Sequence, residues 1–197
     1  MIALLLEPFG YQYMVKAIWV SALVGGVCAF LSCYLMLKGW SLMGDALAHA
    51  IVPGVALAYL LALPYAAGAF LSGLLAALAM ALVRVRTKLR EDAVIGIVFT
   101  TFFAIGLLIV SINPTSVNVQ SIVLGNILGI SDEDVVQVAI IAAVSLVILV
   151  ARWKDMMLVF FDENQARAVG LSPTRMKILF FVLLSACTVA ALQTVGA

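Results

Sequence analysis

The chain has 197 residues, of which 65% are hydrophobic and 11% are charged, and its formal net charge is +1. Soluble domains are nearer half apolar and a quarter charged because their surface must be hydrated, so a mean hydropathy of +1.22 excludes a water-soluble globular protein. No basic stretch is interleaved with aromatic residues, which gives no indication of a nucleic-acid partner, and we predict an all-α, multi-pass protein with the lipid membrane as its solvent.

Six apolar runs are long enough to cross a bilayer, which takes about 20 residues in a helix. They cover residues 13–37, 43–62, 65–83, 93–112, 135–151 and 176–197. Only a short turn around Pro64 joins the second run to the third, so we expect these two helices to form an antiparallel hairpin. The third run is rich in Ala, Gly and Ser, which let helix backbones approach closely in lipid.

The basic residues predict the orientation of this six-span bundle. Cytoplasmic loops of membrane proteins are enriched in Lys and Arg. An N-terminus outside the cell places ten of the eleven Lys and Arg residues in the cytoplasm and leaves only Lys16 outside. The outer loops then carry the acidic residues Asp132, Glu133 and Asp134. We therefore predict that the N-terminus lies outside.

Two segments between the runs have features of their own. Residues 113–134 are half apolar and contain several glycines, so they form either a short interfacial or re-entrant helix or a plain loop. Residues 152–177 are the longest polar stretch, which we assign to a cytoplasmic loop. Within that loop Asp162 can cap a short helix that Gly170 would end.

The last apolar run ends at Ala197 without a charged or polar flank. A membrane helix normally ends in anchoring residues at the interface between lipid and water. We therefore expect residues 1–197 to form a single membrane domain that is incomplete at its C-terminus.

One acidic residue and the only histidine of the chain lie inside the second run. Asp45 and His49 are four residues apart, which places them on one face of a helix. A carboxylate and an imidazole together suit manganese, iron or zinc ions, and ionisable groups inside a membrane usually have a function. We predict a metal path here; the alternative is that Asp45 caps its helix and His49 hydrogen-bonds a neighbour. Pro53 either kinks the helix and frees a carbonyl group near the pair or is an ordinary tolerated proline.

Several segments together resemble the membrane permease of ATP-binding-cassette importers for metal ions. The most specific is GWSLMGDALAHAIVPGVALAYLL, which is similar to the second-helix motif of that family. The segments LGNILGIS, FDENQARAVGLSPTRM and LQTVGA follow in the family's order, so the resemblance spans nearly the whole chain. It implies a type II permease fold like that of the vitamin B12 importer, in a bacterial cytoplasmic (inner) membrane, with further helices beyond this chain.

The resemblance also implies roles and partners. Asp45 and His49 would contact the translocating manganese, iron or zinc ion, with no permanently bound cofactor. A cytoplasmic coupling helix would dock into an ATP-binding subunit, which hydrolyses ATP, so this chain is not itself an enzyme. An extracytoplasmic metal-binding protein would deliver the ion, and the permease would work as a homodimer or a paired permease. The positions that match the coupling helix are Asp162, Glu163, Ala166 and Gly170.

A proton-coupled secondary metal transporter is the main alternative function. It would also use an acid and a histidine in the membrane, but its proton relay would need several ionisable groups, and only Asp45 and His49 qualify here. An intramembrane enzyme is disfavoured because neither HExxH nor GxSxG is present and one histidine cannot build a three-ligand zinc centre. The permease subunit of a metal importer remains the prediction.

Overall fold

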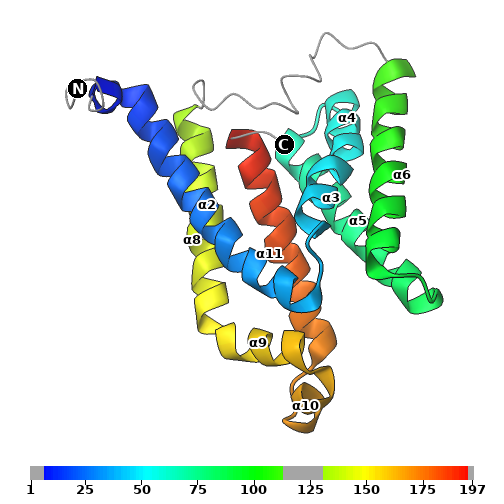
Figure 1. Ribbon diagram of the computed structural model, residues 1–197. Helices are drawn as coiled ribbons and strands as arrows, with labels where there is room; N and C mark the ends of the chain where they lie inside the picture. The colour runs from blue at the N-terminus through cyan, green and yellow to red at the C-terminus, as the bar shows by residue number, and fades with distance from the viewer. Residues whose placement is uncertain (1–6, 113–130, 195–197) are drawn as a thin grey trace.

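A computed structural model describes residues 7–112 and 131–194, and every regular element in these two ranges is helical, which confirms the predicted all-α class (Figure 1). The segment considered for a re-entrant helix falls mostly on residues 113–130, outside the described residues. The elements are η1 (Glu7–Gly10), α2 (Gln12–Lys38), α3 (Met43–Ala50), α4 (Val52–Leu60), α5 (Tyr65–Arg86), α6 (Glu91–Ile112), α8 (Asp132–Ala151), α9 (Trp153–Phe161), α10 (Glu163–Ala168) and α11 (Pro173–Thr194).

The six predicted spans are confirmed within the described ranges. Helices α2, α5, α6, α8 and α11, together with α3 and α4 taken as one, are long and apolar enough to cross a membrane. Each coincides within a few residues with a predicted run. The start of α2 and the end of α11 lie at one end of the bundle, and α9 and α10 lie at the other (Figure 1).

The charged residues are distributed between the two ends of the bundle in the way that the predicted orientation requires. The helix ends near α9 and α10 carry basic residues, such as Lys38 in the last turn of α2 and Arg84 in the last turn of α5. At the opposite end Lys16 forms an ion pair with Asp132, which joins the start of α2 to the start of α8. We therefore call the end with α9 and α10 the cytoplasmic end.

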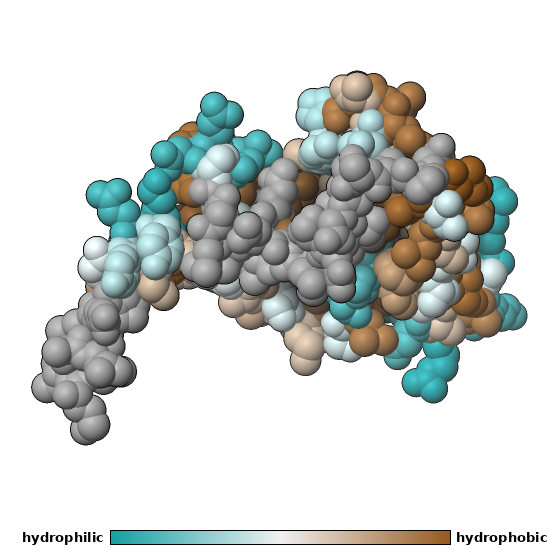
Figure 2. Space-filling view, turned by 90° about the horizontal axis from the view of Figure 1, so that it is seen from above, coloured by the Kyte–Doolittle hydropathy of each residue, from teal (hydrophilic) through white to brown (hydrophobic). Residues whose placement is uncertain are grey.

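Apolar side chains cover much of the outside of the bundle. Seen from the end with both termini, brown apolar residues gather on the right-hand flank, which is the side of α4, α5 and α6 (Figure 2). On α6 the large exposed hydrophobic residues are Ile97, Ile105, Leu107, Leu108 and Ile112. Exposed apolar surface on this scale suits contact with lipid, as the composition predicts.

Helices α4 and α5 form the predicted hairpin and touch through their backbones. A Cβ atom added at Gly54 would overlap the carbonyl oxygen of Gly68 and lie 2.5 Å from the Cβ atom of Ser72. A Cβ atom added at Gly68 would overlap the carbonyl oxygen of Gly54 and lie 2.6 Å from the Cβ atom of Ala58. The small residues of the third run therefore have the predicted role, since any side chain at either glycine would push the helices apart.

The second predicted span is two helices, because the backbone breaks at Ile51. The amide of Gly54 donates to the carbonyl oxygen of Ile51 at 3.0 Å, one residue short of the α-helical acceptor. The carbonyl of Ala50 instead accepts a hydrogen bond from the Ser72 hydroxyl at 2.7 Å. Pro53 lies just after the break and has no amide hydrogen to continue the α3 pattern. Of the two interpretations of Pro53, the structure favours a break in the helix, and the Ala50 carbonyl that leaves the helical pattern is bonded to Ser72.

The polar stretch before α11 holds two helices where a loop with one short helix was predicted. Helix α9 was not predicted, because the stretch was read as a solvated loop. It is apolar on one side: Met156, Val159 and Phe160 are at most 1% exposed and belong to the main core. Burial of these side chains explains why the segment is helical.

Candidate metal path and coupling segment

Asp45 and His49 lie on the same face of α3, as their spacing predicts. Asp45 is in the first turn and His49 in the last. The Nε2 atom of His49 is 3.5 Å from Oδ1 of Asp45, close enough for both to touch one ion. The two side chains differ in exposure, at 71% for Asp45 and 28% for His49. The carboxylate is therefore open to a ligand, whereas the imidazole is held by its surroundings.

Two aromatic rings of α6 hold the imidazole of His49. The ring centroids of Phe99 and Phe103 each lie 5.5 Å from the centroid of the imidazole. Close packing of α6 on α4 supports this contact, because a Cβ atom at Gly106 would lie 2.9 Å from the nitrogen of Pro53. Neither phenylalanine was predicted from the sequence to lie beside His49. Their spacing of four places them on one helix face, but no sequence signal pairs that face with His49.

The pair could supply two protein ligands to a metal ion. Within residues 7–112 and 131–194, no third His, Cys, Asp or Glu joins them in a group that could hold a metal. Manganese, iron and zinc ions take four or more ligands, so the other positions would go to water or to groups outside these ranges.

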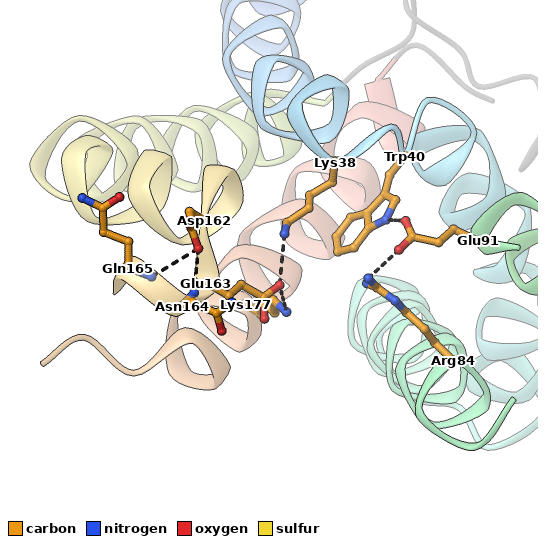
Figure 3. A network of polar contacts seen from close by, with 9 residues as sticks. All are labelled: Lys38, Trp40, Arg84, Glu91, Asp162, Glu163, Asn164, Gln165 and Lys177. Atoms are coloured by element: carbon orange, nitrogen blue, oxygen red, sulfur yellow. Dashed lines mark hydrogen bonds and ion pairs between the residues drawn. The ribbon is translucent and has the colours of Figure 1, made fainter. Parts of the chain in front are cut away.

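The predicted caps of the short cytoplasmic helix are both present. The carboxylate of Asp162 accepts hydrogen bonds from the backbone amides of Asn164 at 2.8 Å and Gln165 at 3.2 Å, which starts α10 (Figure 3). Gly170 has a φ of 88°, a left-handed conformation that glycine adopts without strain. Its amide donates to the carbonyl of Arg167, which ends the helical segment.

The four residues matched to the coupling helix face different surroundings. Asp162 and Gly170 shape the ends of the segment. Ala166 is 0% exposed and belongs to the main core, so it packs α10 onto the permease and is not on an exposed docking face. Val169, at 68% exposure, is the large hydrophobic residue of this segment that is exposed. Docking of the segment to an ATP-binding subunit stays a prediction.

Glu163 joins α10 to two spans through ion pairs. Its Oε1 atom accepts from Nζ of Lys177 in α11 at 2.6 Å and from Nζ of Lys38 in α2 at 3.0 Å (Figure 3). Partial burial by itself would raise the pKa of this carboxyl, but the hydrogen bonds and charges of Lys177 and Lys38 outweigh it and lower the pKa from 4.5 to about 2. Glu163 was predicted from the sequence as a coupling residue, but neither lysine was predicted as its partner.

Comparison with known proteins decides the family. Residues 10–197 match the family described as the ABC 3 transport family. The chain belongs to this family. The ABC 3 chain is 75% identical over 197 residues to the chelated iron transport system membrane protein YfeC of Yersinia pestis, covering 100% of the chain and 67% of YfeC. It is 52% identical over 195 residues to the manganese transport system membrane protein MntB of Synechocystis, covering 98% of the chain and 63% of MntB.

A solved structure supports the fold of the ABC 3 chain. PsaBC from Streptococcus pneumoniae, in complex with Fab, aligns with a TM-score of 0.85 and 33% sequence identity over 100% of this chain and 71% of the solved chain. The chain thus spans about two thirds of the length of the proteins it matches. Family and spans together make it a multi-pass permease component of the cytoplasmic membrane, which transports and is not an enzyme.

The Glu163 ion pairs predict a pH dependence of stability in the ABC 3 chain. Because the pKa of Glu163 falls from 4.5 to about 2 on folding, its stabilising effect is complete above about pH 4.5 and is lost as the pH falls toward 2. The difference in melting temperature between the native protein and Glu163→Gln should be constant from about pH 7 to pH 5 and shrink below that. Thermal unfolding of purified protein at several pH values measures it. An unchanged difference near pH 3 would contradict the assignment.

Proposed function

We propose that the chain is the permease subunit of an ATP-driven importer that carries manganese or iron ions, with Asp45 and His49 in the ion path. The observation that carries the proposal is the carboxylate–imidazole pair on one face of α3, with its carboxylate 71% exposed. Both donors suit these metals and also zinc. YfeC is named for chelated iron and MntB for manganese, which supports the first two metals more directly than zinc.

The exposure of Asp45 supports a paired permease. An ionised carboxylate that faced lipid would be unfavourable, so intramembrane acids normally face a protein interior or a water-filled path. We therefore infer that the open face of α3 borders a path between this chain and a second permease subunit. The second subunit is either another copy of this chain or a related one, and an ATP-binding subunit and an extracytoplasmic metal-binding protein complete the transporter.

The mechanism that we propose is alternating access. ATP binding would close the ATP-binding subunits, and these would move α10 together with the spans to which it is bound. The Asp45–His49 face would then open first to the outside and next to the cytoplasm. Asp45 and His49 are the only Asp, Glu, His, Lys or Arg residues within the second span, residues 43–60, and a proton-coupled transporter would need more ionisable groups than these two.

Transport in proteoliposomes tests this function. The complete permease is reconstituted with its ATP-binding subunit and metal-binding protein, ATP is supplied on the side of the ATP-binding subunit, and uptake of radioactive manganese, iron and zinc is measured. We expect uptake of manganese or iron that stops when the ATP-binding subunit carries an inactivating substitution and continues when a protonophore is added. Uptake that needs a proton gradient and no ATP would contradict the proposal and favour the secondary transporter.

A further inference from the structure

The connection between α2 and α3 lies between two groups of polar contacts at the cytoplasmic end. On one side, Lys38 at the end of α2 reaches Glu163 of α10 (Figure 3). On the other side, Trp40 reaches Glu91 at the start of α6, which also pairs with Arg84 of α5 (Figure 3). Lys38 and Trp40 are two residues apart, so one short segment contacts α10 through Lys38 and contacts α5, α6, α9 and α11 through Trp40.

Trp40 is held firmly in this position. It is 5% exposed, and its indole stacks on the ring of Phe181 with centroids 5.6 Å apart. The guanidinium carbon of Arg84 lies 5.3 Å from the indole centroid, within reach of a cation–π interaction. The indole N–H donates to the carboxylate of Glu91. Apolar packing and polar contacts therefore act on the same side chain, and a shift of α3 at this point must move its neighbours.

The backbone of Trp40 links the two helices directly. Its amide donates to the carbonyl of Leu35 in α2 at 2.9 Å, and its carbonyl accepts from the amide of Met43 at the start of α3 at 3.1 Å. Gly39, with a φ of 72°, makes the turn between them. Asp45 lies only two residues beyond Met43. A displacement of Lys38 therefore acts on the first turn of the helix that carries the metal pair.

We propose that the segment Lys38–Trp40 transmits the movement of α10 to Asp45 and His49, and that Glu163 is a positioning residue for this coupling. The inference rests on the proposed function, because it assumes that an ATP-binding subunit moves α10. Glu163 contacts Lys38 and Lys177 and is 26% exposed, so we assign it to joining α10 to the spans and not to docking. The low exposure of Lys38, 16%, strengthens the ion pair relative to a pair in open water.

The test compares ATP hydrolysis with transport in the reconstituted complete transporter. For Glu163→Gln we expect the ATP-binding subunit to co-purify as in the native protein and to hydrolyse ATP at a similar rate. Metal imported per ATP hydrolysed should fall about tenfold, the size of a typical coupling between sites. Glu163→Asp, which keeps the charge, should recover part of that ratio. Glu163→Gln combined with Lys38→Gln should be no worse than the worse of the two single variants, because both remove one interaction.

Asp155→Asn is the matched control. Asp155 also lies at the cytoplasmic end and pairs with Arg152 at 3.2 Å, but this pair lies at one end of α9 and joins no distant helices. The amount of metal imported per ATP hydrolysed by the Asp155→Asn transporter should equal that of the native transporter. A native ratio in Glu163→Gln would overturn the inference, and so would loss of the ATP-binding subunit, which would make Glu163 a docking residue. If the native complex imports no metal under ATP, the proposed function itself has failed, which this control set distinguishes.

Discussion

Substitution of Asp45 by asparagine should reduce metal uptake by the complete transporter about 100-fold. Asparagine keeps the size of the side chain and one oxygen, but it removes the negative charge that binds a divalent cation. Even residues that only support a metal ligand change affinity about 10- to 100-fold, and a ligand itself should reach the upper end of that range. The carboxylate is exposed and lies beside His49, so the substitution has no buried partner to disturb. Uptake of radioactive manganese and iron measures the effect.

Asp92→Asn is the matched control for this prediction. Asp92 is also an acid in the first turn of a spanning helix, α6, and it is exposed. The same chemical change there should leave uptake near the native level. Both variants should co-purify with the ATP-binding subunit to the same extent, which separates transport from assembly. Native uptake by Asp45→Asn would contradict a metal path at the pair. It would favour the alternative, in which Asp45 caps its helix and His49 has only a packing role.

Substitution of Gly54 by alanine should destabilise the protein by about 3 kcal/mol, the upper range for overpacking a close contact. The added Cβ atom would overlap the carbonyl oxygen of Gly68, and a backbone cannot move aside as a flexible side chain can. Helices α4 and α5 would have to separate. That movement would also weaken the hydrogen bond from Ser72 to the Ala50 carbonyl at the break next to His49. Melting temperature and membrane abundance measure the loss.

Gly26→Ala provides the comparison for Gly54→Ala. Gly26 lies in α2, and a Cβ atom there would meet nothing within 4 Å. Alanine is favoured over glycine inside a helix by about 0.5–1 kcal/mol, so this variant should be as stable as the native protein or slightly more stable. Equal melting temperatures for the two variants would show that α4 and α5 are not in backbone contact in the membrane.

Local rules explain which features could be predicted from the sequence. The hydrophobic runs predict the spans because the bilayer requires about 20 apolar residues wherever a helix crosses it. The spacing of Asp45 and His49 predicts their shared face, since a helix repeats every 3.6 residues, and the distance of 3.5 Å confirms it. Asp162 predicts the start of α10 because its carboxylate bonds amides only two and three residues away.

Contacts between residues distant in the chain could not be predicted in this way. Lys38 and Glu163 are 125 residues apart, and either could have been a solvated surface charge. Trp40 pairs with Glu91, 51 residues further on. Helix α9 is stable because the core covers one of its sides, and its nine residues are too few to predict a membrane span from their apolar composition.

The sequence by itself therefore determined the all-α membrane class, the six spans and the acid–histidine pair. Each depends on the bilayer or on residues within one or two helical turns of each other. The tertiary structure decided where the second span breaks, which rings hold His49 and which spans Glu163 joins. These features depend on how separate helices pack, and packing brings together side chains whose separation in sequence carries no signal of their contact.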